Sequence, residues 1–345
     1  MKSISRIMRK LLAFGLLPAA AVVLTGCDGF IFEDEGDCDP YYKVRFRYDR
    51  NLKFADAFAA EVDEVTLYVA DAATGRIVWQ KHESGNALKR AGYLMDVNVR
   101  PGNYTLVAWC GEGHRTSFGV DDGDNVADLR CRLESRTPAA DGKGGDVTED
   151  LGRLYHGCVE NVNFTDEQGV HVYDVALTKN TNSVKIVLQH LSGEKVDDSD
   201  FHFTITDSNG LMDWDNSLLE DERLTYHAWE TRSGMAGVDV PDYTDSRAVT
   251  HLGAAVASHT VGRMVKGHDM RVNVYNRDGE TVVSVPLIDY ALLVKGKYSR
   301  ELTDQEYLDY QDEYSMVFFL DERDRWIDSY IYINSWRVVL QDTDL

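Results

Sequence analysis

The stretch Tyr-Tyr-Lys-Val-Arg-Phe-Arg-Tyr (residues 41–48) decides the fold class, because apolar and basic side chains alternate along it. In an extended chain, successive side chains point to opposite faces. Val44, Phe46 and Tyr48 therefore share one face, and the basic residues between them share the other. This period of two predicts a β-strand with one buried face and one solvated face.

Similar short apolar stretches recur along the rest of the chain. Further strands are predicted at residues 65–69, 76–80, 92–99, 104–110, 170–177, 184–191, 201–206, 270–275, 281–285, 316–320, 327–333 and 336–340. Many short strands separated by turns are typical of β-sandwiches. The sequence therefore predicts an all-β protein.

Turn and helix signals punctuate these strands. Pro101-Gly102 predicts a tight turn, because proline fixes one φ and glycine tolerates the next. Asn-Gly at 209–210 and the stretch 276–279 predict hairpins. One helix is predicted over residues 302–311, where Thr303 and Glu306 have the spacing of a capping box.

The pattern divides the chain into four parts. Residues 111–150 are rich in Gly and Asp and are predicted as loops, and Lys-Asn-Thr-Asn at 179–182 is a polar break. We place a domain boundary at this break. The predicted parts are a signal peptide (1–26), an acidic tether (27–40), an N-terminal sandwich (41–179) and a C-terminal sandwich (180–345).

The first 27 residues indicate export and lipidation. Four basic residues precede a 14-residue apolar stretch from Leu11 to Leu24, which is too short to span a bilayer and is typical of a secretory signal. Leu-Thr-Gly-Cys at 24–27 then resembles a bacterial lipobox. In that motif the cysteine thiol receives fatty acyl chains such as palmitate and the cysteine becomes the new N-terminus. Cys27 is thus the predicted lipidation site, and the alternative is a signal peptide with a chance cysteine.

The net charge of the chain limits the kinds of partner it can bind. Removal of residues 1–26 takes away four basic groups and no acids, so the net charge changes from −22 to −26. Such an acidic chain argues against a nucleic-acid partner, because phosphate binding needs a basic face. Two or more acyl chains hold a protein stably on a membrane. The outer membrane, through the lipid on Cys27, is therefore a predicted partner.

An acidic stretch, Glu-Asp-Glu-Gly-Asp at 33–37, lies close behind Cys27. Anionic lipid headgroups repel such a tether, which would project the domains outwards. The stretch also resembles the acidic export signal of some Bacteroidota lipoproteins of the outer cell surface. The alternative is an ordinary solvated linker.

Four cysteines remain besides Cys27, namely Cys38, Cys110, Cys131 and Cys158. An oxidising compartment permits a disulfide among them, and four cysteines allow three pairings. None of the spacings is Cys-x-x-Cys, which argues against a zinc site. The sequence does not choose a pairing.

Signals of catalysis are weak. The chain has no His-Glu-x-x-His pair, no Gly-x-Ser-x-Gly elbow and no glycine-rich phosphate loop, so we predict neither an enzyme nor a cofactor. Acids at 121–124 lack the glutamate that a twelve-residue calcium loop needs, so a solvated loop is favoured and no metal is predicted. Asp213 and Asp215 are interpreted as turn residues and His156 as locally packed. Trp214 and Trp229 lie in polar stretches and are the two candidates for binding aromatics.

An ordered set of segments resembles the FimB-type fimbrial anchor lipoprotein family of Bacteroidales, a branch of the type V fimbrial proteins in the fimbrillin superfamily. The matching segments are the lipobox and residues 44–51, 64–69, 101–109, 154–157, 177–180, 213–216 and 333–339. They follow the expected order along nearly the whole mature chain. Each segment alone is a weak signal, and the order gives the set its specificity.

The resemblance implies two tandem transthyretin-like β-sandwiches on a lipid anchor. Shaft relatives lose their first strand to proteolysis after an arginine, and a C-terminal strand of the next subunit fills the open groove. An anchor keeps its first strand, so residues 41–48 would be the retained strand and residues 336–345 the candidate donor. Fimbrial shaft subunits are then the implied partners, and the implied function is anchoring a fimbria and terminating or regulating its assembly.

Alternatives to this reading stay open. Arg45, Arg47 and Arg50 lie near the position at which a shaft subunit would be cut, so a tip or shaft fimbrillin of the same superfamily is one alternative. A surface glycan-binding lipoprotein is the other. The closing segment can also serve as core of the second sandwich rather than as a donor.

Overall fold

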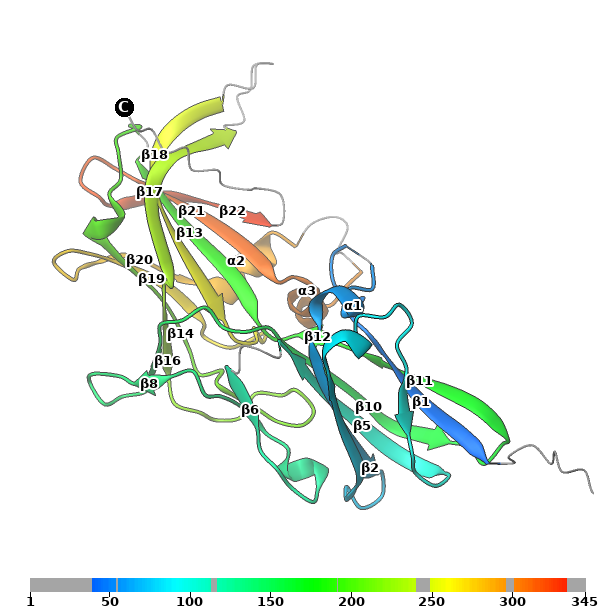
Figure 1. Cartoon of the computed structure of the whole chain (residues 1–345). Coiled ribbons are helices and arrows are strands. Elements are labelled where there is room, and N and C mark those ends of the chain that lie inside the picture. The colour runs from blue at the N-terminus through cyan, green and yellow to red at the C-terminus, as the bar shows by residue number, and fades with distance from the viewer. Residues whose placement is uncertain are drawn as a thin grey trace, which may run out of the picture. The chain divides into compact units, whose positions relative to one another are not determined.

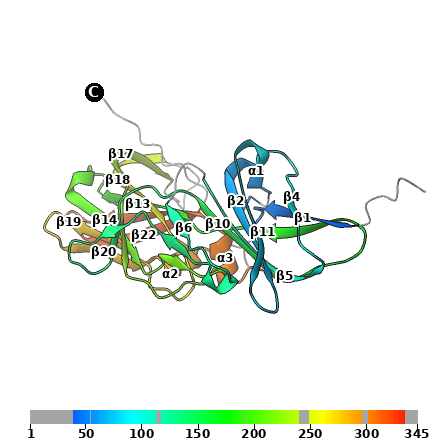
Figure 2. The ribbon, with the colours of Figure 1, turned by 60° about the horizontal axis from the view of Figure 1, so that its bottom comes forward.

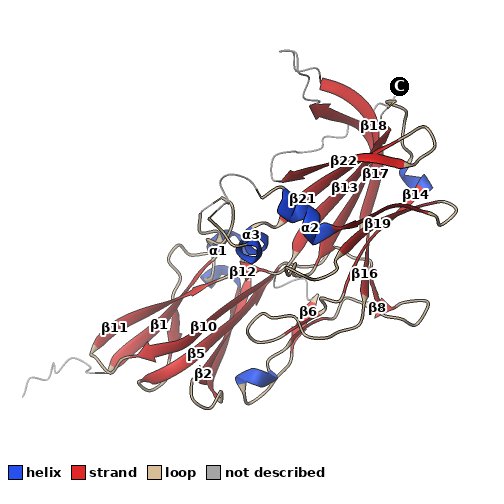
Figure 3. Cartoon of the chain, turned by 180° about the vertical axis from the view of Figure 1, so that it is seen from behind, coloured by secondary structure: helices blue, strands red, loops and turns tan. Residues whose placement is uncertain are grey.

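The structure is a computed structural model that describes residues 39–53, 55–112, 117–190, 192–239, 249–295 and 301–333. Strands make up most of the described chain and the helices are short (Figure 3), which confirms the predicted all-β class. The helices are α1 (Phe58–Glu61), α2 (Leu287–Leu293) and α3 (Asp304–Tyr310).

Two sheets built mainly from the first half of the chain enclose one core. The first sheet has the order β11 (Gly169–Ala176), β1 (Pro40–Arg47) and β4 (Met95–Val97). The second has the order β12 (Thr178–Lys179), β10 (Leu154–Phe164), β5 (Gly102–Gly111), β2 (Glu64–Asp71) and β3 (Ile77–Ser84) (Figure 1). Among the described residues, their shared hydrophobic cluster draws on residues between 42 and 177.

Two larger sheets enclose a second core. One has the order β17 (Glu230–Asp239), β18 (Val249–Val261), β13 (Asn182–His190), β21 (Glu313–Leu320) and β22 (Trp326–Ile333). The other has the order β20 (Thr281–Pro286), β19 (Arg271–Asn276), β14 (Phe201–Asp207), β16 (Leu224–His227), β9 (Gly145–Val147) and β8 (Thr137–Pro138). Buried residues of α2 and α3 join this second cluster.

The prediction of loops over residues 111–150 was wrong in part. A small sheet joins β6 (Phe118–Val120), β7 (Cys131–Leu133) and β15 (Leu211–Met212), and β9 pairs in parallel with β16. Leu133 and Val147 thereby enter the second core. Met212 and Tyr226, the strand partners of Cys131 and Val147, lie about 80 residues further along the chain, and local periodicity does not report such distant pairing. The domain bounds 41–179 and 180–345 stay a prediction.

The predicted hairpin at Asn209-Gly210 was also wrong. Strand β14 pairs with β16 and β19, and the residues after Gly210 pair with β7 instead of returning along β14. Asn209 is buried, accepts a hydrogen bond from the Tyr226 hydroxyl at 2.6 Å and donates to the Arg263 carbonyl at 3.0 Å. These tertiary bonds replace the turn that the dipeptide favours in isolation.

Other local signals were confirmed. Strands β19 and β20 form the hairpin predicted around residues 276–279, with Gly279 at φ +77°. Helix α3 begins after Thr303, and its capping box with Glu306 is complete. The strand predicted at 92–99 is shorter, at Met95–Val97.

Candidate functional site

Strand β1 lies between two neighbours, as Figure 2 shows. Eight residue pairs join it in parallel to β11, and three pairs join it antiparallel to β4. Both of its edges are thus paired over the span of Tyr42–Val44. The carbonyl of Arg47 accepts a further hydrogen bond from the backbone of Leu177 at 2.7 Å.

The inner face of β1 is buried as the alternation predicted. Tyr42, Val44, Phe46 and Tyr48 are at most 3% exposed. The Phe46 ring stacks on Phe58 with centroids 5.6 Å apart. Burial of each such side chain contributes about 1.5–3 kcal/mol, so the strand is an integral part of the first core.

Ion pairs cover the outer face of β1. The Arg45 guanidinium donates two hydrogen bonds to the Asp174 carboxylate, at 2.6 and 2.8 Å, and Lys43 pairs with Asp96 on β4. The bonds from Arg45 lower the pKa of Asp174. Because the Arg45 and Asp174 side chains are 46% and 42% exposed, the pair adds at most about 1 kcal/mol. These ion pairs align β1 on β11 and β4 more than they stabilise it.

A clasped turn follows β1. The Asn51 side chain is buried and donates to the carbonyls of Tyr48 and Ala55, both at 2.8 Å. Asp56 accepts hydrogen bonds from the backbone of Tyr48 and Phe58. Proteases cut exposed, unpaired segments most readily. Arg50 is the exposed arginine in this clasped turn, and it also donates to the Thr178 hydroxyl at 3.1 Å.

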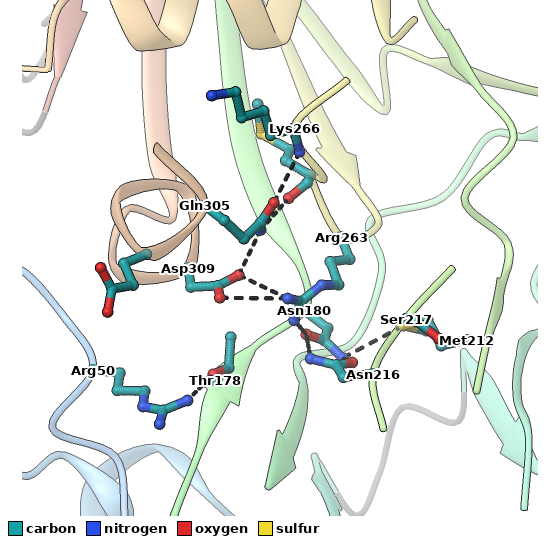
Figure 4. A network of polar contacts seen from close by, with 12 residues as sticks. Arg50, Thr178, Asn180, Met212, Asn216, Ser217, Arg263, Lys266, Gln305 and Asp309 are labelled. Atoms are coloured by element: carbon teal, nitrogen blue, oxygen red, sulfur yellow. Dashed lines mark hydrogen bonds and ion pairs between the residues drawn. The ribbon is translucent and has the colours of Figure 1, made fainter. Parts of the chain in front are cut away.

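A buried polar junction joins segments far apart in sequence (Figure 4). Asn180 donates to the Asn216 amide oxygen at 2.6 Å, and Asn216 donates back at 3.1 Å. Asn216 adopts φ +72°, which asparagine tolerates better than most residues. The polar break at 179–182 is thus not a solvated linker, because Asn180, Thr181 and Asn182 are all buried.

An ion pair completes this junction. Arg263 donates to the Asn180 amide oxygen at 3.1 Å and lies 3.0 Å from a carboxylate oxygen of Asp309 on α3. Gln305, one turn earlier on α3, donates to the same carboxylate at 2.9 Å. Burial raises the pKa of Asp309, and the Arg263 guanidinium opposes that shift. No pattern in the sequence pointed to Arg263 or Asp309.

The prediction that His156 packs locally was wrong. Its ring lies 4.4 Å from the Trp109 ring, and its Nε2 is 2.8 Å from the Trp214 carbonyl, 58 residues away. Residues 154–157, 177–180 and 213–216 therefore meet at one place, although the sequence showed them only as separate motifs. Burial lowers the pKa of His156 to about 4, so its imidazole is neutral at pH 7 and donates to the carbonyl.

The free energy of unfolding should decrease at acid pH because of His156. A pKa of about 4 in the folded state, against about 6.5 unfolded, means that the unfolded chain binds the proton better. The contribution is present above pH 6.5 and is lost as the pH falls towards 4, by on the order of 3 kcal/mol. His156→Gln, which keeps a donor near the Nε2 position, should flatten the stability profile across this window in urea titrations. Parallel profiles for the wild type and the variant would contradict the assignment.

The remaining candidate residues do not assemble into a site. Trp214 is half-buried against Met212 and its neighbours, and Trp229 is 38% exposed. Asp213 and Asp215 accept backbone hydrogen bonds from residues 214 and 217, which confirms the predicted turn. Across the described residues, no group of three or more His, Cys, Asp or Glu side chains is arranged to hold a metal ion.

Three cysteines lie within the described residues. Cys110, Cys131 and Cys158 are free thiols in the described structure. Cys27, Cys38 and the predicted donor at 336–345 lie outside the described residues. Within the described ranges, every helix is too short or too polar to cross a bilayer.

Comparison with known proteins defines the class. A candidate adhesin from Bacteroides thetaiotaomicron is 32% identical, with a TM-score of 0.72 over 89% of this chain and 100% of its own. A second B. thetaiotaomicron structure, described as a candidate polysaccharide-binding protein, is 29% identical, with a TM-score of 0.71 over 89% and 99% of the two chains. Among curated proteins, none matches this chain. The fold is that of Bacteroides adhesin-type β proteins.

The family follows from a wider match. The model of the fimbrillin-A associated anchor proteins Mfa1 and Mfa2 matches residues 34–342, and the chain belongs to this family. The fimbrial anchor protein Mfa2 from Porphyromonas gingivalis shares the fold, with a TM-score of 0.62, 16% identity and coverage of 88% and 100% of the two chains. Membership confirms the resemblance drawn from the sequence. It points to a fimbria-associated role in the cell envelope and to association with fimbrial subunits.

Proposed function

We propose that this protein anchors a fimbria to the outer membrane and ends its growth. In this proposal, lipid on Cys27 holds the chain in the membrane, and the segment 336–345 inserts as a strand into the adjoining shaft subunit. The observation that carries the proposal is strand β1, which is paired on both edges and buried on its inner face. An acceptor groove that already holds its own strand offers no place to a further subunit.

Strand donation is strong enough for this role. Each backbone hydrogen bond contributes about 0.5–1.5 kcal/mol net. A donated strand of several residues also fills pockets with its alternate side chains. Replacing β1 by a foreign strand would break its eleven residue pairs and the ion pairs of Lys43 and Arg45. The donor end of this chain is then the only partner-binding end, and polymerisation stops here.

Replacement of Cys27 by serine tests the anchor. Cells carrying Cys27→Ser are expected to shed fimbriae into the medium, because serine lacks the thiol that is acylated. Electron microscopy of cells and immunoblots of the medium measure the loss. Cys158→Ser, which changes a thiol inside the fold, is the matched control and should retain fimbriae. Full retention by the Cys27→Ser cells would refute the anchor.

Deletion of residues 337–345 tests the donor separately. Copurification of shaft subunits with the truncated protein should be lost, while the protein itself stays in the membrane fraction. N-terminal sequencing of the native protein tests the alternative of a processed fimbrillin. A start at Cys27 supports the anchor, and a start beyond about residue 50 means that β1 is removed as in a shaft subunit.

A glycan-binding role is the second candidate, since one relative at 29% identity is described as a candidate polysaccharide-binding protein. Trp229 is the more exposed of the two candidate aromatics. Calorimetry with surface polysaccharides separates the roles. Heat that disappears in Trp229→Ala would favour glycan binding, and its absence with wild type would favour the anchor.

A further inference from the structure

The sheet formed by β17, β18, β13, β21 and β22 has two faces, and one of them faces the second core. The opposite face carries a separate apolar cluster, which we call the outer cluster. It consists of Val187, Ala254, Val256, Val317 and Phe319. All five side chains are 9% exposed or less.

Among the described residues, the outer cluster draws on a single layer. Its members come from β13, β18 and β21, and no hydrophobic side chain from another part of the described chain joins it. Side chains of one sheet face alone do not bury one another so completely, because the side chains stand roughly perpendicular to the sheet. A second layer is therefore needed to keep this face from water.

A buried amide on the same face also indicates that a second layer covers it. Gln189 alternates with Val187 along β13 and is fully buried. Its Nε2 and Oε1 atoms have no hydrogen-bond partner among the described residues. A buried amide without a partner costs about 1–3 kcal/mol. A covering segment with free backbone N–H and C=O groups would satisfy it.

We propose that the C-terminal segment, residues 334–345, covers the outer cluster. The chain leaves β22 at Ile333, which pairs with Tyr314 on the strand that carries Val317 and Phe319. Tyr314 and Phe319 are five positions apart on β21, a distance of about 17 Å. The twelve residues of the segment reach about 40 Å when extended, and they include Trp336, Val338, Val339 and Leu340.

The segment between β17 and β18 is a poorer occupant. Residues 240–248 contain two aspartates, one arginine and one proline. They connect Asp239 and Val249, which pair five residues beyond Ala254 along the hairpin. Of these two segments, the C-terminal one combines a large aromatic residue, consecutive aliphatic residues and a start beside β21.

This inference rests on the proposed donor role. The arrangement stores the donor strand on its own sheet until a shaft subunit accepts it. An exposed apolar strand end is an aggregation hazard, and storage removes it. Donation then competes with an internal contact. Only a subunit whose groove binds the segment more tightly than the outer cluster does will take it.

The test uses the purified mature chain without shaft subunits or membrane, so that it does not depend on fimbria formation. Gln189→Glu replaces the buried amide by a carboxylate side chain of nearly the same shape, which carries a negative charge when ionised. Ionised glutamate resists burial, so hydrogen exchange in residues 334–345 should be at least about tenfold faster than in wild type near neutral pH. It should slow again as the pH falls towards about 4, where free glutamate takes up a proton.

Lys185→Glu is the matched control, because Lys185 lies on the same face but is exposed beyond the cluster. Its C-terminal segment should exchange as slowly as that of the wild type. In a second measurement, a synthetic peptide of residues 334–345 should bind the chain truncated after Ile333, and Trp336→Ala in the peptide should weaken binding at least about tenfold. Equal exchange in Gln189→Glu and wild type, or a peptide that does not bind, would overturn the inference while leaving the Cys27 anchor untouched.

Discussion

Replacing Arg263 by alanine is expected to lower the free energy of unfolding by up to about 3–5 kcal/mol, the loss typical when one member of a buried ion pair is removed, because this pair is mostly shielded from water. The guanidinium is the partner of the Asp309 carboxylate and of the Asn180 amide oxygen, at 3.0 and 3.1 Å. Both side chains of the ion pair are less than a fifth exposed. Without Arg263, the mostly shielded carboxylate loses its ion-pair partner and keeps the hydrogen bond from Gln305. Urea unfolding followed by tryptophan fluorescence measures the loss.

The control for this prediction is an ion pair on the surface. Arg277 pairs with Asp200, and its side chain is 67% exposed. Arg277→Ala should therefore cost no more than about 1 kcal/mol. Adding Asp309→Asn to Arg263→Ala should restore part of the lost stability, because the amide carries no charge to bury. Equal losses in the two arginine variants would show that the junction is not a stabilising element.

Lowering the pH should reduce the loss of stability in the Arg263→Ala variant. Burial raises the pKa of Asp309, and removal of the Arg263 guanidinium removes the largest of the influences that oppose this shift. The folded variant then takes up a proton at a higher pH than the unfolded chain does. The deficit relative to wild type is present above the raised pKa and should shrink as the pH falls through it.

The sequence predicted correctly those elements whose pattern involves only neighbouring residues. Residues 41–48 alternate without a break, and the capping box of Thr303 and Glu306 needs only four residues, so β1 and α3 could be read from the sequence. Strand β10 was missed although it has eleven residues. Its second half contains Glu160, Asn161 and Asn163, and Asn161 adopts φ +54° where the register with β5 shifts. A bulge of this kind interrupts the period of two on which the prediction depends.

The junction escaped prediction for a different reason. Asn180, Asn216, Arg263 and Asp309 are polar residues, and polar residues in a single sequence indicate solvent or turns. They lie buried or mostly shielded where segments up to 129 residues apart meet, and mutual hydrogen bonds and an ion pair satisfy them there. The family motifs at 177–180 and 213–216 marked two of these segments, but only the fold showed that they touch. A polar break between two strand-rich regions can therefore be a buried joint as well as a linker.

Replacing Phe46 by alanine is the second large prediction, and it tests the seated first strand directly. Phe46 is 2% exposed and stacks on Phe58, so the free energy of unfolding should fall by about 3–5 kcal/mol. If β1 opens locally from β11 and β4, its open state becomes more populated, and an arginine-specific protease should cut near Arg45 and Arg47 about a hundredfold faster. Mass spectrometry of the released N-terminal peptide gives the rate.

The matched control for Phe46→Ala lies on the same strand. Tyr41 is 47% exposed on the outer face, so Tyr41→Ala removes an aromatic ring without opening the core. It should leave the cleavage rate close to that of the wild type, in which β1 resists the protease because its whole length pairs with β11 and its inner face is buried. Rapid cleavage of the wild type at Arg45 or Arg47 would contradict the anchor, since a strand that is removed so easily leaves an acceptor groove open. Slow cleavage of the wild type together with fast cleavage of Phe46→Ala would show that the packing of Phe46 keeps β1 in place, as the proposed end of polymer growth requires.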